Sequence, residues 1–455
     1  MSSKANYDLT ETFEHLVQLL DAEKYTEVDQ FLKQEHPADI ADLLEMLDDD
    51  HRLKVFERLH LNVAAEVLDE ARTDTLQELV EALPDDKLAD LLEVMPSDDA
   101  AEILSEIDED QAEAIIALMA PDEANEVEKL LAYEEDTAGR LMATNIVRLV
   151  EDWTIAQTLE YLRSIDLSVE TLTYLYVVDT TGKLVGIIPI WKLLTAQPHE
   201  QLTQLMQTSV ITVTVDTDQE EVARVVSQYD FFAVPVVDLN GKLMGIVTHD
   251  DVIDVINDEF TEDAQRFGGS QPLEGSYFST PVWTMVRKRV GWLLLLFLTA
   301  QFTTSIMGIF QTDLETVVAL SFFVPLLIGT GGNAGSQMTA TMIRAVAMNE
   351  VRFEDTWRVV GREFFTGAWL GLLMAVASFG LSAAWGNTPH LAITLALALF
   401  VVVIWANLMG VMLPITAARM KIDPTVISGP VMSTLVDATG LLIYFMLARL
   451  ILAEI

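Results

Sequence analysis

Pro325-Leu-Leu-Ile-Gly-Thr-Gly-Gly-Asn-Ala-Gly-Ser-Gln337 is the stretch around which we expect the rest of the chain to be organised. It continues an apolar run, 317–328, that is typical of a membrane-spanning helix, yet it contains four glycines and several polar side chains. Unpaired backbone and amide groups cost several kcal/mol in hydrocarbon, which excludes a lipid-facing helix. Two interpretations remain. Either the small residues serve close packing between helices, or the glycines let the helix break and line a pore with polar groups. The carboxylate of the last predicted span, described below, leads us to expect the second.

Apolar segments on both sides of this stretch predict five membrane-spanning helices. They lie at 290–309, 317–340, 364–385, 391–413 and 431–452. Basic residues cluster at 287–289, between Arg344 and Arg362, and at Arg419 and Lys421, all in loops on one side. The positive-inside rule then predicts that the N-terminus lies in the cytoplasm and the C-terminus outside. We expect the membrane to be a bacterial-type plasma membrane. The first residues lack the apolar core of a signal peptide, which agrees with that orientation.

The charge of the chain is concentrated ahead of residue 281. The 455 residues carry a formal charge of −43, yet from residue 281 onward 10 basic and 9 acidic side chains nearly cancel. The segment 1–280, with 17 basic and 61 acidic side chains, therefore carries −44. So acidic a region repels nucleic acid, and we expect no such partner. The chain has no cysteine, which excludes disulfides, thiolate zinc sites and a cysteine nucleophile.

Asp437 is a carboxylate inside a predicted span, in Pro430-Val-Met-Ser-Thr-Leu-Val-Asp-Ala-Thr-Gly440. A charge at the bilayer centre costs about 3 kcal/mol, so its presence needs a reason. Ser433 and Thr434 precede it by four and three residues, on the same helix face. A protonated Asp437 that hydrogen-bonds to another helix is one interpretation; we favour a cation site to which Asn333 also contributes. Oxygen ligands alone suit hydrated Mg²⁺, and a two-fold dimer would place two Asp437 carboxylates around one axis.

Residues 1–135 predict a series of short helices, because apolar side chains recur at three- and four-residue steps. Ala41-Asp-Leu-Leu, Ala65-Glu-Val-Leu and Ala89-Asp-Leu-Leu recur at a constant spacing, which indicates a small all-α solenoid. Ser97 and Asp98, after Pro96, are residues of the kind that cap a helix. Most carboxylates of this segment are expected to form a solvated face.

Residues 136–258 contain a duplicated unit. Val177-Val-Asp-Thr-Thr-Gly-Lys-Leu-Val-Gly-Ile-Ile returns further along the chain as Val236-Val-Asp-Leu-Asn-Gly-Lys-Leu-Met-Gly-Ile-Val. Each copy predicts a strand, a tight turn, a second strand and the start of a helix. The unit resembles a tandem pair of CBS domains, α/β modules that often bind adenine nucleotides. Only the second copy carries Thr248 and Asp251, the pair that can hold a ribose in relatives, so ATP binding stays open.

The helix predicted after this unit carries a stripe of carboxylates. Its members are Asp251, Asp254, Asp258, Glu259, Glu262 and Asp263. Like charges at these spacings destabilise a helix by about 0.3 kcal/mol per pair. Bound cations would relieve that repulsion, and an ordinary solvated helix is the alternative. Gly268, Gly269 and Pro272 indicate a break before the first span.

Gly331-Gly-Asn-Ala-Gly-Ser-Gln337, Asp423-Pro424 and the stretch 430–440 resemble the MgtE family of magnesium channels, as does the order of domains. The resemblance covers essentially the whole chain. It implies a homodimer in the lipid bilayer, a pore lined by the second and fifth spans with Asp437 as its selectivity carboxylate, and closure by Mg²⁺ bound among the cytosolic domains. The sensing positions that match are Asp251, Asp254, Glu259, Glu262, Asp263 and Asp423, with Asp86 and Asp90 in the first domain. Gly429 stands where some relatives have Asn, so one pore contact is expected to be missing.

The expected fold is therefore multidomain. It comprises an all-α acidic N-terminal solenoid at 1–135, α/β tandem CBS domains at 136–258, a connecting (plug) helix at 259–280 and a five-helix α transmembrane domain at 281–455. The expected function is a Mg²⁺-selective import channel that cytosolic Mg²⁺ closes, and not an enzyme. The alternative is a broader transporter of Co²⁺, Mn²⁺ and Ca²⁺ regulated by nucleotide at the CBS pair. An anion channel would need interior basic residues, and an intramembrane hydrolase a second interior carboxylate or a His-Glu-x-x-His motif; the spans contain neither.

Overall fold

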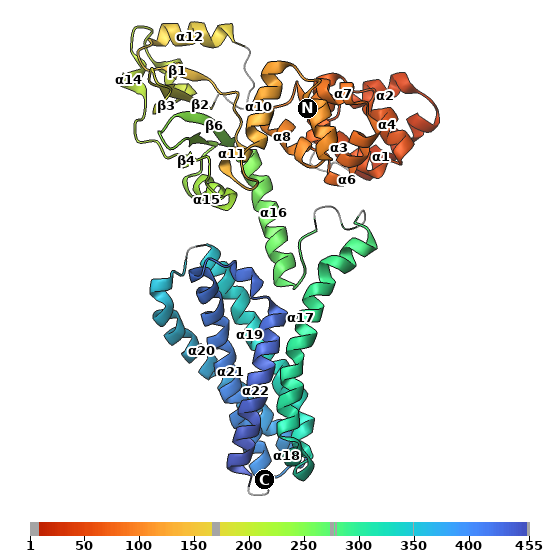
Figure 1. The fold of residues 1–455 in the computed structure, drawn as a ribbon, viewed down its shortest axis with the longest axis vertical. Helices are drawn as coiled ribbons and strands as arrows, with labels where there is room; N and C mark the ends of the chain where they lie inside the picture. The colour runs from red at the N-terminus through yellow and green to blue at the C-terminus, as the bar shows by residue number, and fades with distance from the viewer. Residues whose placement is uncertain (1–8, 166–172, 274–276, 278–279, 349, 453–455) are drawn as a thin grey trace. The chain divides into compact units, whose positions relative to one another are not determined.

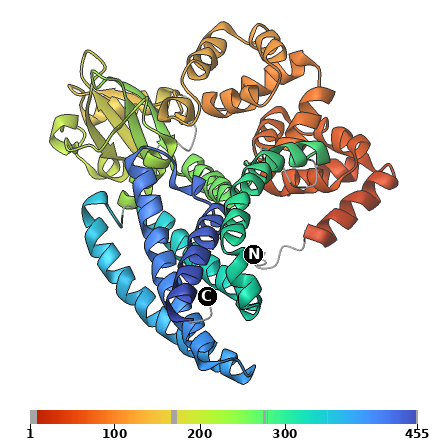
Figure 2. The ribbon, with the colours of Figure 1, turned by 60° about the horizontal axis from the view of Figure 1, so that its bottom comes forward.

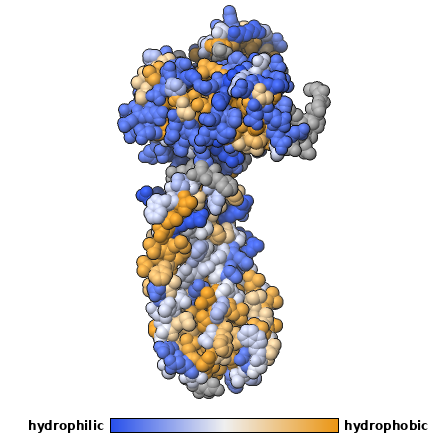
Figure 3. Space-filling view, turned by 90° about the vertical axis from the view of Figure 1, so that its right-hand side faces the viewer, coloured by the Kyte–Doolittle hydropathy of each residue, from blue (hydrophilic) through white to orange (hydrophobic). Residues whose placement is uncertain are grey.

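The computed structural model describes residues 9–165, 173–273, 277, 280–348 and 350–452 (Figure 1). The chain divides into two compact units. The first comprises Met1–Glu259 and Glu274–Ser279, and the second comprises Phe260–Leu273 and Thr280–Ile455. On the face in Figure 3 the first unit is mostly hydrophilic, whereas hydrophobic residues cover much of the second.

Short helices build the N-terminal part of the first unit. They are α1 (Leu9–Asp21), α2 (Tyr25–Leu32), α3 (Pro37–Met46), α4 (Asp49–Phe56), α5 (Leu61–Asp69), α6 (Thr73–Ala82), α7 (Asp85–Leu92), α8 (Ser97–Ser105), α9 (Glu109–Ile116) and α10 (Pro121–Leu131). From α1 to α9 each odd-numbered helix contacts the next odd-numbered one. Ala41, Ala65 and Ala89 of the sequence repeat are buried on α3, α5 and α7. The repeat therefore marks equivalent buried positions, where small side chains let successive helices approach.

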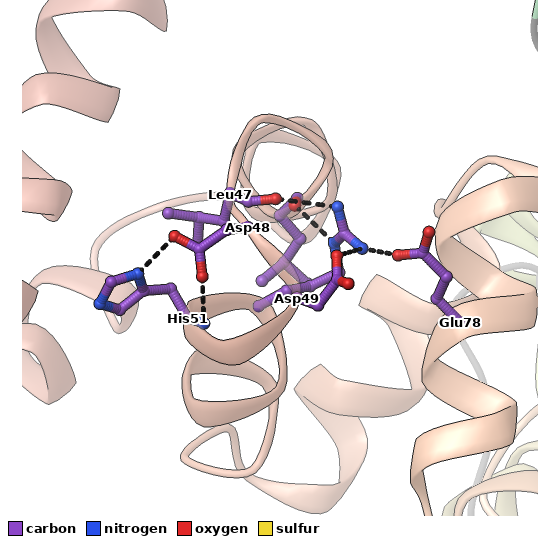
Figure 4. Close-up of polar contacts among 7 residues, drawn as sticks. Leu47, Asp48, Asp49, His51 and Glu78 are labelled. Atoms are coloured by element: carbon purple, nitrogen blue, oxygen red, sulfur yellow. Dashed lines mark hydrogen bonds and ion pairs between the residues drawn. The ribbon is translucent and has the colours of Figure 1, made fainter. Parts of the chain in front are cut away.

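Arg52 of α4 shows how this acidic part uses its few cations. Its guanidinium donates to the carbonyl oxygens of Leu44 and Leu47 at 3.0 and 2.8 Å, and pairs with Asp49 and with Glu78 of α6. Figure 4 shows these contacts, together with Asp48, which caps α4 by accepting from the backbone N–H of His51 at 3.1 Å. A buried cation at the carbonyl end of α3 satisfies groups that the helix leaves unpaired.

The duplicated unit forms two three-stranded sheets with the same topology. In the first, β1 (Arg148–Val150) is parallel to β2 (Tyr174–Val178), which is antiparallel to β3 (Leu184–Pro189). The second repeats this with β4 (Val213–Thr214), β5 (Ala233–Val237) and β6 (Leu243–Thr248). The helices around them are α11 (Ala138–Leu141), α12 (Ile155–Ser164), α13 (Ile190–Thr195), α14 (Leu202–Leu205) and α15 (Gln219–Tyr229). The predicted strand–turn–strand–helix order of each copy is confirmed.

A residue ahead of each copy pairs with a strand of the other copy. Ala143, ahead of the first copy, forms an antiparallel bridge with Ile246 of the second, and Gln207 forms one with Ile187 of the first. A single hydrophobic core then runs from the N-terminal helices through the second copy to Val252 and Val255. The acidic helices and the second CBS copy are thus packed as one body.

Helix α16 (His249–Phe267) follows β6 without a break and belongs to both units, since the division falls after Glu259. The predicted connecting helix of 259–280 therefore differs from the observed one, which begins ten residues earlier and ends at Phe267. No glycine or proline interrupts 249–267, whereas Gly269, at φ +78°, ends the helix.

Long helices form the second unit. They are α17 (Val282–Ile309), α19 (Ala319–Ala347), α20 (Thr356–Ala384), α21 (Pro389–Arg419) and α22 (Gly429–Ile451), with the short α18 (Gln311–Thr316), η2 (Phe353–Asp355) and η3 (Pro424–Val426) between them. Within this unit α19, α21 and α22 contact one another, α20 lies along α21, and α17 along α22 (Figures 1 and 2).

Four helices in the described chain are long and apolar enough to cross a membrane: Val282–Ile309, Phe353–Ala384, Pro389–Arg419 and Gly429–Ile451. Helix α19 has 29 residues, but its glycine-rich polar stretch lowers its hydropathy, so it is not among them. Five spans therefore stay a prediction. The expectation that glycines break this helix is wrong, because α19 is continuous through 329–337. Gly331, Gly332 and Gly335 instead lie against neighbouring helices, which is the packing role of small residues.

Candidate cation sites

Asp437 of α22 lies beside the glycine-rich face of α19. Its Oδ1 is buried and accepts no hydrogen bond from the part of the chain that the structure describes. A Cβ atom placed on Gly332 would lie 3.5 Å from that oxygen and 3.2 Å from Ser433 Oγ. Glycine at 332 therefore brings the α19 backbone close to the carboxylate. A buried carboxylate oxygen without a hydrogen-bond donor is available to coordinate a cation.

Ser336 and Ser433 complete this polar strip between α19 and α22. Ser336 Oγ donates to the carbonyl oxygen of Gly429 at 3.1 Å and lies 3.2 Å from Ser433 Oγ. The strip therefore consists of Asp437, Ser433, Ser336 and the bare backbone at Gly332. Ser336 was not predicted, although its position four residues after Gly332 places both on one helix face.

Two predicted pore residues take other positions. Asn333 is exposed on α19, and no contact joins it to Asp437 within this single chain, as far as the structure describes it. Thr434 Oγ1 donates to the carbonyl oxygen of Pro430 at 2.9 Å, inside its own helix. The structure thus brings Ser433 to Asp437, whereas roles for Asn333 and Thr434 in a pore stay predictions.

Substitution by alanine distinguishes the glycines that pack from one that does not. A Cβ at Gly331 would lie 2.8 Å from Val402 and 2.9 Å from Val436, whereas a Cβ at Gly329 meets nothing within 4 Å. We expect Gly331→Ala to cost about 1–3 kcal/mol through overpacking and to lower the thermal midpoint of the detergent-solubilised protein. Gly329→Ala is the matched control and should leave the midpoint unchanged or raised. Equal midpoints would contradict the packing role of Gly331.

A second group of carboxylates lies inside the first unit. One oxygen from each of Asp98 and Asp99 (α8) and Asp251 (α16) lies within 4.8 Å of the other two, an arrangement that suits a metal ion. Contacts between α8 and the CBS pair hold the group together. Ser97 Oγ lies 2.9 Å from Thr144 Oγ1, and Arg140 donates to the carbonyl oxygen of Ala101 at 3.3 Å. Ser97 thus joins two domains rather than capping α8, whose N-cap is Pro96.

Asp251 is held by Thr248, its predicted partner in the nucleotide half-site. Thr248 donates to Asp251 Oδ2 from its hydroxyl at 2.6 Å and from its backbone N–H at 3.1 Å. The same carboxylate therefore belongs to the CBS half-site and to the acidic group. In the first copy Pro189 is the N-cap of α13, which begins at Ile190, and Trp191 is 61% exposed there.

Desolvation, with repulsion between carboxylates as the second cause, raises several pKa values around this group. Desolvation, followed by repulsion from Asp69, Asp98 and Asp251, raises the pKa of Asp99 well above its ordinary value. Desolvation and then Glu102 raise the pKa of Asp69 to about 7. The pKa values of Glu102, Asp254 and Asp258 are raised by desolvation and then by neighbouring carboxylates. These last three side chains and Asp69 keep solvent access, so a hydrated ion can reach them.

These raised pKa values predict a pH dependence. Protonation of these carboxylates stabilises the compact first unit. That stability is fully present below their ordinary pKa, which is 3.8 for Asp69, and it is lost as the pH rises through about 7. Mg²⁺ binding at pH 7 should therefore release protons, on the order of one per chain. Titration calorimetry of the whole protein in two buffers of different ionisation enthalpy measures this release. Asp69→Asn should reduce it, and buffer-independent heats would contradict the expectation.

The remaining predicted regulatory residues are distributed along α16 and beyond it. Glu259 accepts from Gln219 Nε2 at 2.6 Å in the first unit. Glu262 pairs with Arg266, which also binds Asp423, within the second unit, and Asp263 is partly exposed on α16. Asp86 and Asp90 are exposed on α7, and neither belongs to the acidic group. Sequence reasoning missed Asp98 and Asp99 of the group and the neighbouring Asp69 and Glu102. The i, i+4 spacing of Asp98 and Glu102 was the available signal.

Comparison with known proteins identifies the family. A model described as divalent cation transporter matches residues 324–447, one described as the MgtE intracellular N domain matches 35–136, and the CBS domain model matches 138–199 and 202–258. The magnesium transporter MgtE of Thermus thermophilus is 41% identical over 323 residues, which are 71% of this chain and 72% of that protein. The chain belongs to the MgtE family.

Other MgtE proteins support this assignment. The magnesium transporter MgtE of Bacillus subtilis is 36% identical over 316 residues, 70% of each chain. The crystal structure of the soluble part of a magnesium transporter covers 55% of this chain and 99% of its own, at 32% identity and a TM-score of 0.51. The cytosolic domain of the Mg²⁺ channel MgtE in complex with ATP covers 53% and 98%, at 37% identity and a TM-score of 0.51. The resemblance to MgtE proteins inferred from the residues is confirmed.

Proposed function

We propose that this MgtE protein is a Mg²⁺-selective import channel that cytosolic Mg²⁺ closes. The observation that carries the proposal is Asp437, whose buried Oδ1 lacks a donor among the described residues and lies, like Ser433 Oγ, beside the bare backbone of Gly332. Carboxylate, hydroxyl and backbone oxygens bind Mg²⁺ while leaving it most of its water, so an ion can enter and leave quickly. Asn333 and Thr434 would add oxygens to the water shell.

The quaternary arrangement is part of the proposal. Two chains form a homodimer in a bacterial plasma membrane, with the N-terminus in the cytoplasm and the C-terminus outside, and α19 crosses the membrane as well, which makes five spans. Two Asp437 carboxylates around one axis give a doubly negative ring suited to a divalent cation. The domains at 1–135, 136–258 and 281–455 belong to the same proposal, with α16 (His249–Phe267) as the connecting helix in place of the predicted 259–280.

Regulation rests on the acidic group of the first unit. When cytosolic Mg²⁺ is low, Asp98, Asp99 and Asp251 repel one another and favour separation of α8 from α16. When Mg²⁺ rises, ions bind the compact arrangement more tightly than the separated one and shift the population toward it. Since α16 belongs to both units, its position can pass this change to the membrane helices.

A broader divalent-cation transporter under nucleotide control is the second candidate. Thr248 and Asp251 are favourably placed for a ribose, and a relative's cytosolic domain binds ATP. A nucleotide hydroxyl on Asp251 would compete with Thr248 for the oxygen that Thr248 now occupies. Nucleotide and metal occupancy would then be coupled through one carboxylate.

Full-length protein in excised membrane patches tests both candidates. We expect a Mg²⁺ current that falls as Mg²⁺ rises on the cytosolic face, with smaller currents for Ca²⁺, Mn²⁺ and Co²⁺. Equal currents for all four ions, altered by ATP, would favour the second candidate. A current that ignores cytosolic Mg²⁺ would contradict the regulation, and no current above that of protein-free membrane would contradict both.

A further inference from the structure

Asp423, in the loop between α21 and α22, already has donors for both of its oxygens. Oδ1 accepts from the backbone N–H of Thr425 at 2.8 Å, and Oδ2 accepts from the Thr425 hydroxyl at 2.6 Å. Arg266, in the last turn of α16, donates to Oδ2 at 2.7 Å. Burial alone would raise the pKa of Asp423, but the hydrogen bonds from Thr425 and then Arg266 lower it below its ordinary value. The carboxylate is thus ionised and satisfied without a metal.

The Arg266 guanidinium lies between two carboxylates that were predicted as metal ligands. It pairs with Glu262 one turn earlier on α16 and with Asp423 on the membrane-side loop. A divalent ion that bridged Glu262 and Asp423 would have to displace a cation that the chain supplies itself. The fixed fork of a guanidinium suits such bridging of carboxylates.

Further contacts hold this end of α16, and the residues that follow it, against the membrane helices. A Cβ at Gly429 would lie 3.5 Å from the Phe267 ring, so glycine at this position makes room for that ring at the start of α22. Gly269 lies against Trp292 of α17 and Pro430 of α22. Lys288 Nζ donates to the carbonyl oxygen of Pro272 at 2.6 Å. None of these contacts requires a metal.

We infer that Arg266 is a tethered cation that takes the place of Mg²⁺ at Asp423 and holds the end of α16 on the α21–α22 loop at every Mg²⁺ concentration. This inference rests on the proposed function and refines it: Mg²⁺ sensing belongs to the acidic group of the first unit, whereas the Arg266–Asp423 pair adds a constant bias toward closure. Asp423 is then a latch residue and not a metal ligand.

The sign of two substitutions separates a latch from a metal site. For a latch, Arg266→Met and Asp423→Asn each raise the cytosolic Mg²⁺ concentration at half-closure, by about twofold to fivefold for a partly exposed pair. The double variant should shift it no further than either single one. The exchanged pair Arg266→Asp with Asp423→Arg should restore the wild-type value, and Arg266→Lys should keep most of it. If Asp423 instead binds Mg²⁺, Arg266→Met removes a competing cation and lowers that concentration while Asp423→Asn raises it; opposite signs would overturn the inference.

A measurement without Mg²⁺ separates failure of this inference from failure of the proposed function. In chelator, hydrogen exchange of full-length wild type should show residues 260–267 protected, and Arg266→Met should lose that protection. Unprotected wild type, or an unchanged variant, would overturn the latch whatever the channel does. Protection that depends on Arg266 in a protein whose current ignores Mg²⁺ would keep the latch and reject the regulation.

Discussion

Asp437→Ala is expected to reduce Mg²⁺ uptake by at least about 100-fold, because it removes a unit charge next to the permeating ion. At 4 Å and an effective dielectric constant near 20, two unit charges interact by about 4 kcal/mol, which corresponds to roughly three powers of ten. Oδ1 of Asp437, near Gly332 and Ser433, accepts no hydrogen bond among the described residues, and those two neighbours carry no charge that could replace the carboxylate in the variant. Uptake into vesicles that contain the reconstituted protein and a Mg²⁺ indicator measures this loss.

Two further variants test whether a loss of uptake is due to the charge of Asp437. Asp437→Asn keeps the shape of the side chain and should lose nearly as much uptake, which assigns the effect to charge. Glu315→Gln removes an exposed carboxylate of α18 that accepts from Gln311 at 2.8 Å, and it should keep uptake within about twofold of wild type. Unchanged uptake by Asp437→Ala would remove Asp437 from the pore.

Asp99→Asn combined with Asp251→Asn is expected to abolish most of the response to cytosolic Mg²⁺. The double variant replaces two of the three grouped carboxylates by uncharged amides, which bind Mg²⁺ more weakly, so the Mg²⁺ concentration at half-closure should rise at least about tenfold. Its metal-free form should also be more compact than that of wild type, because bringing these side chains together no longer costs either repulsion or protonation of a carboxylate. Compared with wild type, the variant should therefore be less sensitive to protease without Mg²⁺ and should gain less protection when Mg²⁺ is added.

Asp86→Asn combined with Asp90→Asn is the matched control for this experiment. It removes the same charge from the same acidic part of the chain, but from exposed positions of α7 outside the group. We expect it to keep the wild-type protease pattern and the wild-type half-closure. If both double variants lost the response equally, total charge rather than the grouped carboxylates would be the sensor.

Sequence reasoning succeeded where the local sequence around a residue allowed only one physical explanation for its presence. Asp437 in an apolar span could be recognised because burial of a charge is costly, and the CBS pair because its turns repeat. Asp98 and Asp99 were not recognised, because a carboxylate in a first helical turn is ordinary. Only their proximity to Asp251 of α16 distinguishes them from Asp86 and Asp90, and that proximity depends on the core shared between domains.

The glycines of α19 illustrate a different limit. Gly, Asn and Ser in an apolar segment predict either a broken helix or close packing, and local sequence does not decide between them. The outcome depends on Val402, Met432 and Val436, which lie on two other helices and occupy the space beside Gly331 and Gly335. Likewise, the partner of Asp423 was unpredictable, because Arg266 is 157 residues away in the chain.

Because α16 is uninterrupted, it fixes the angle about its axis between the sensing residue Asp251 and the latch residue Arg266. Asp251 and Arg266 are fifteen residues apart on one helix, an axial separation of about 22 Å and a relative rotation of about 60°. Inserting one residue between them would turn one site by about 100° relative to the other, whereas inserting seven would nearly restore the original angle. The helix therefore sets both the distance and the angle between the two residues, so its length can change only by insertions or deletions that keep that angle.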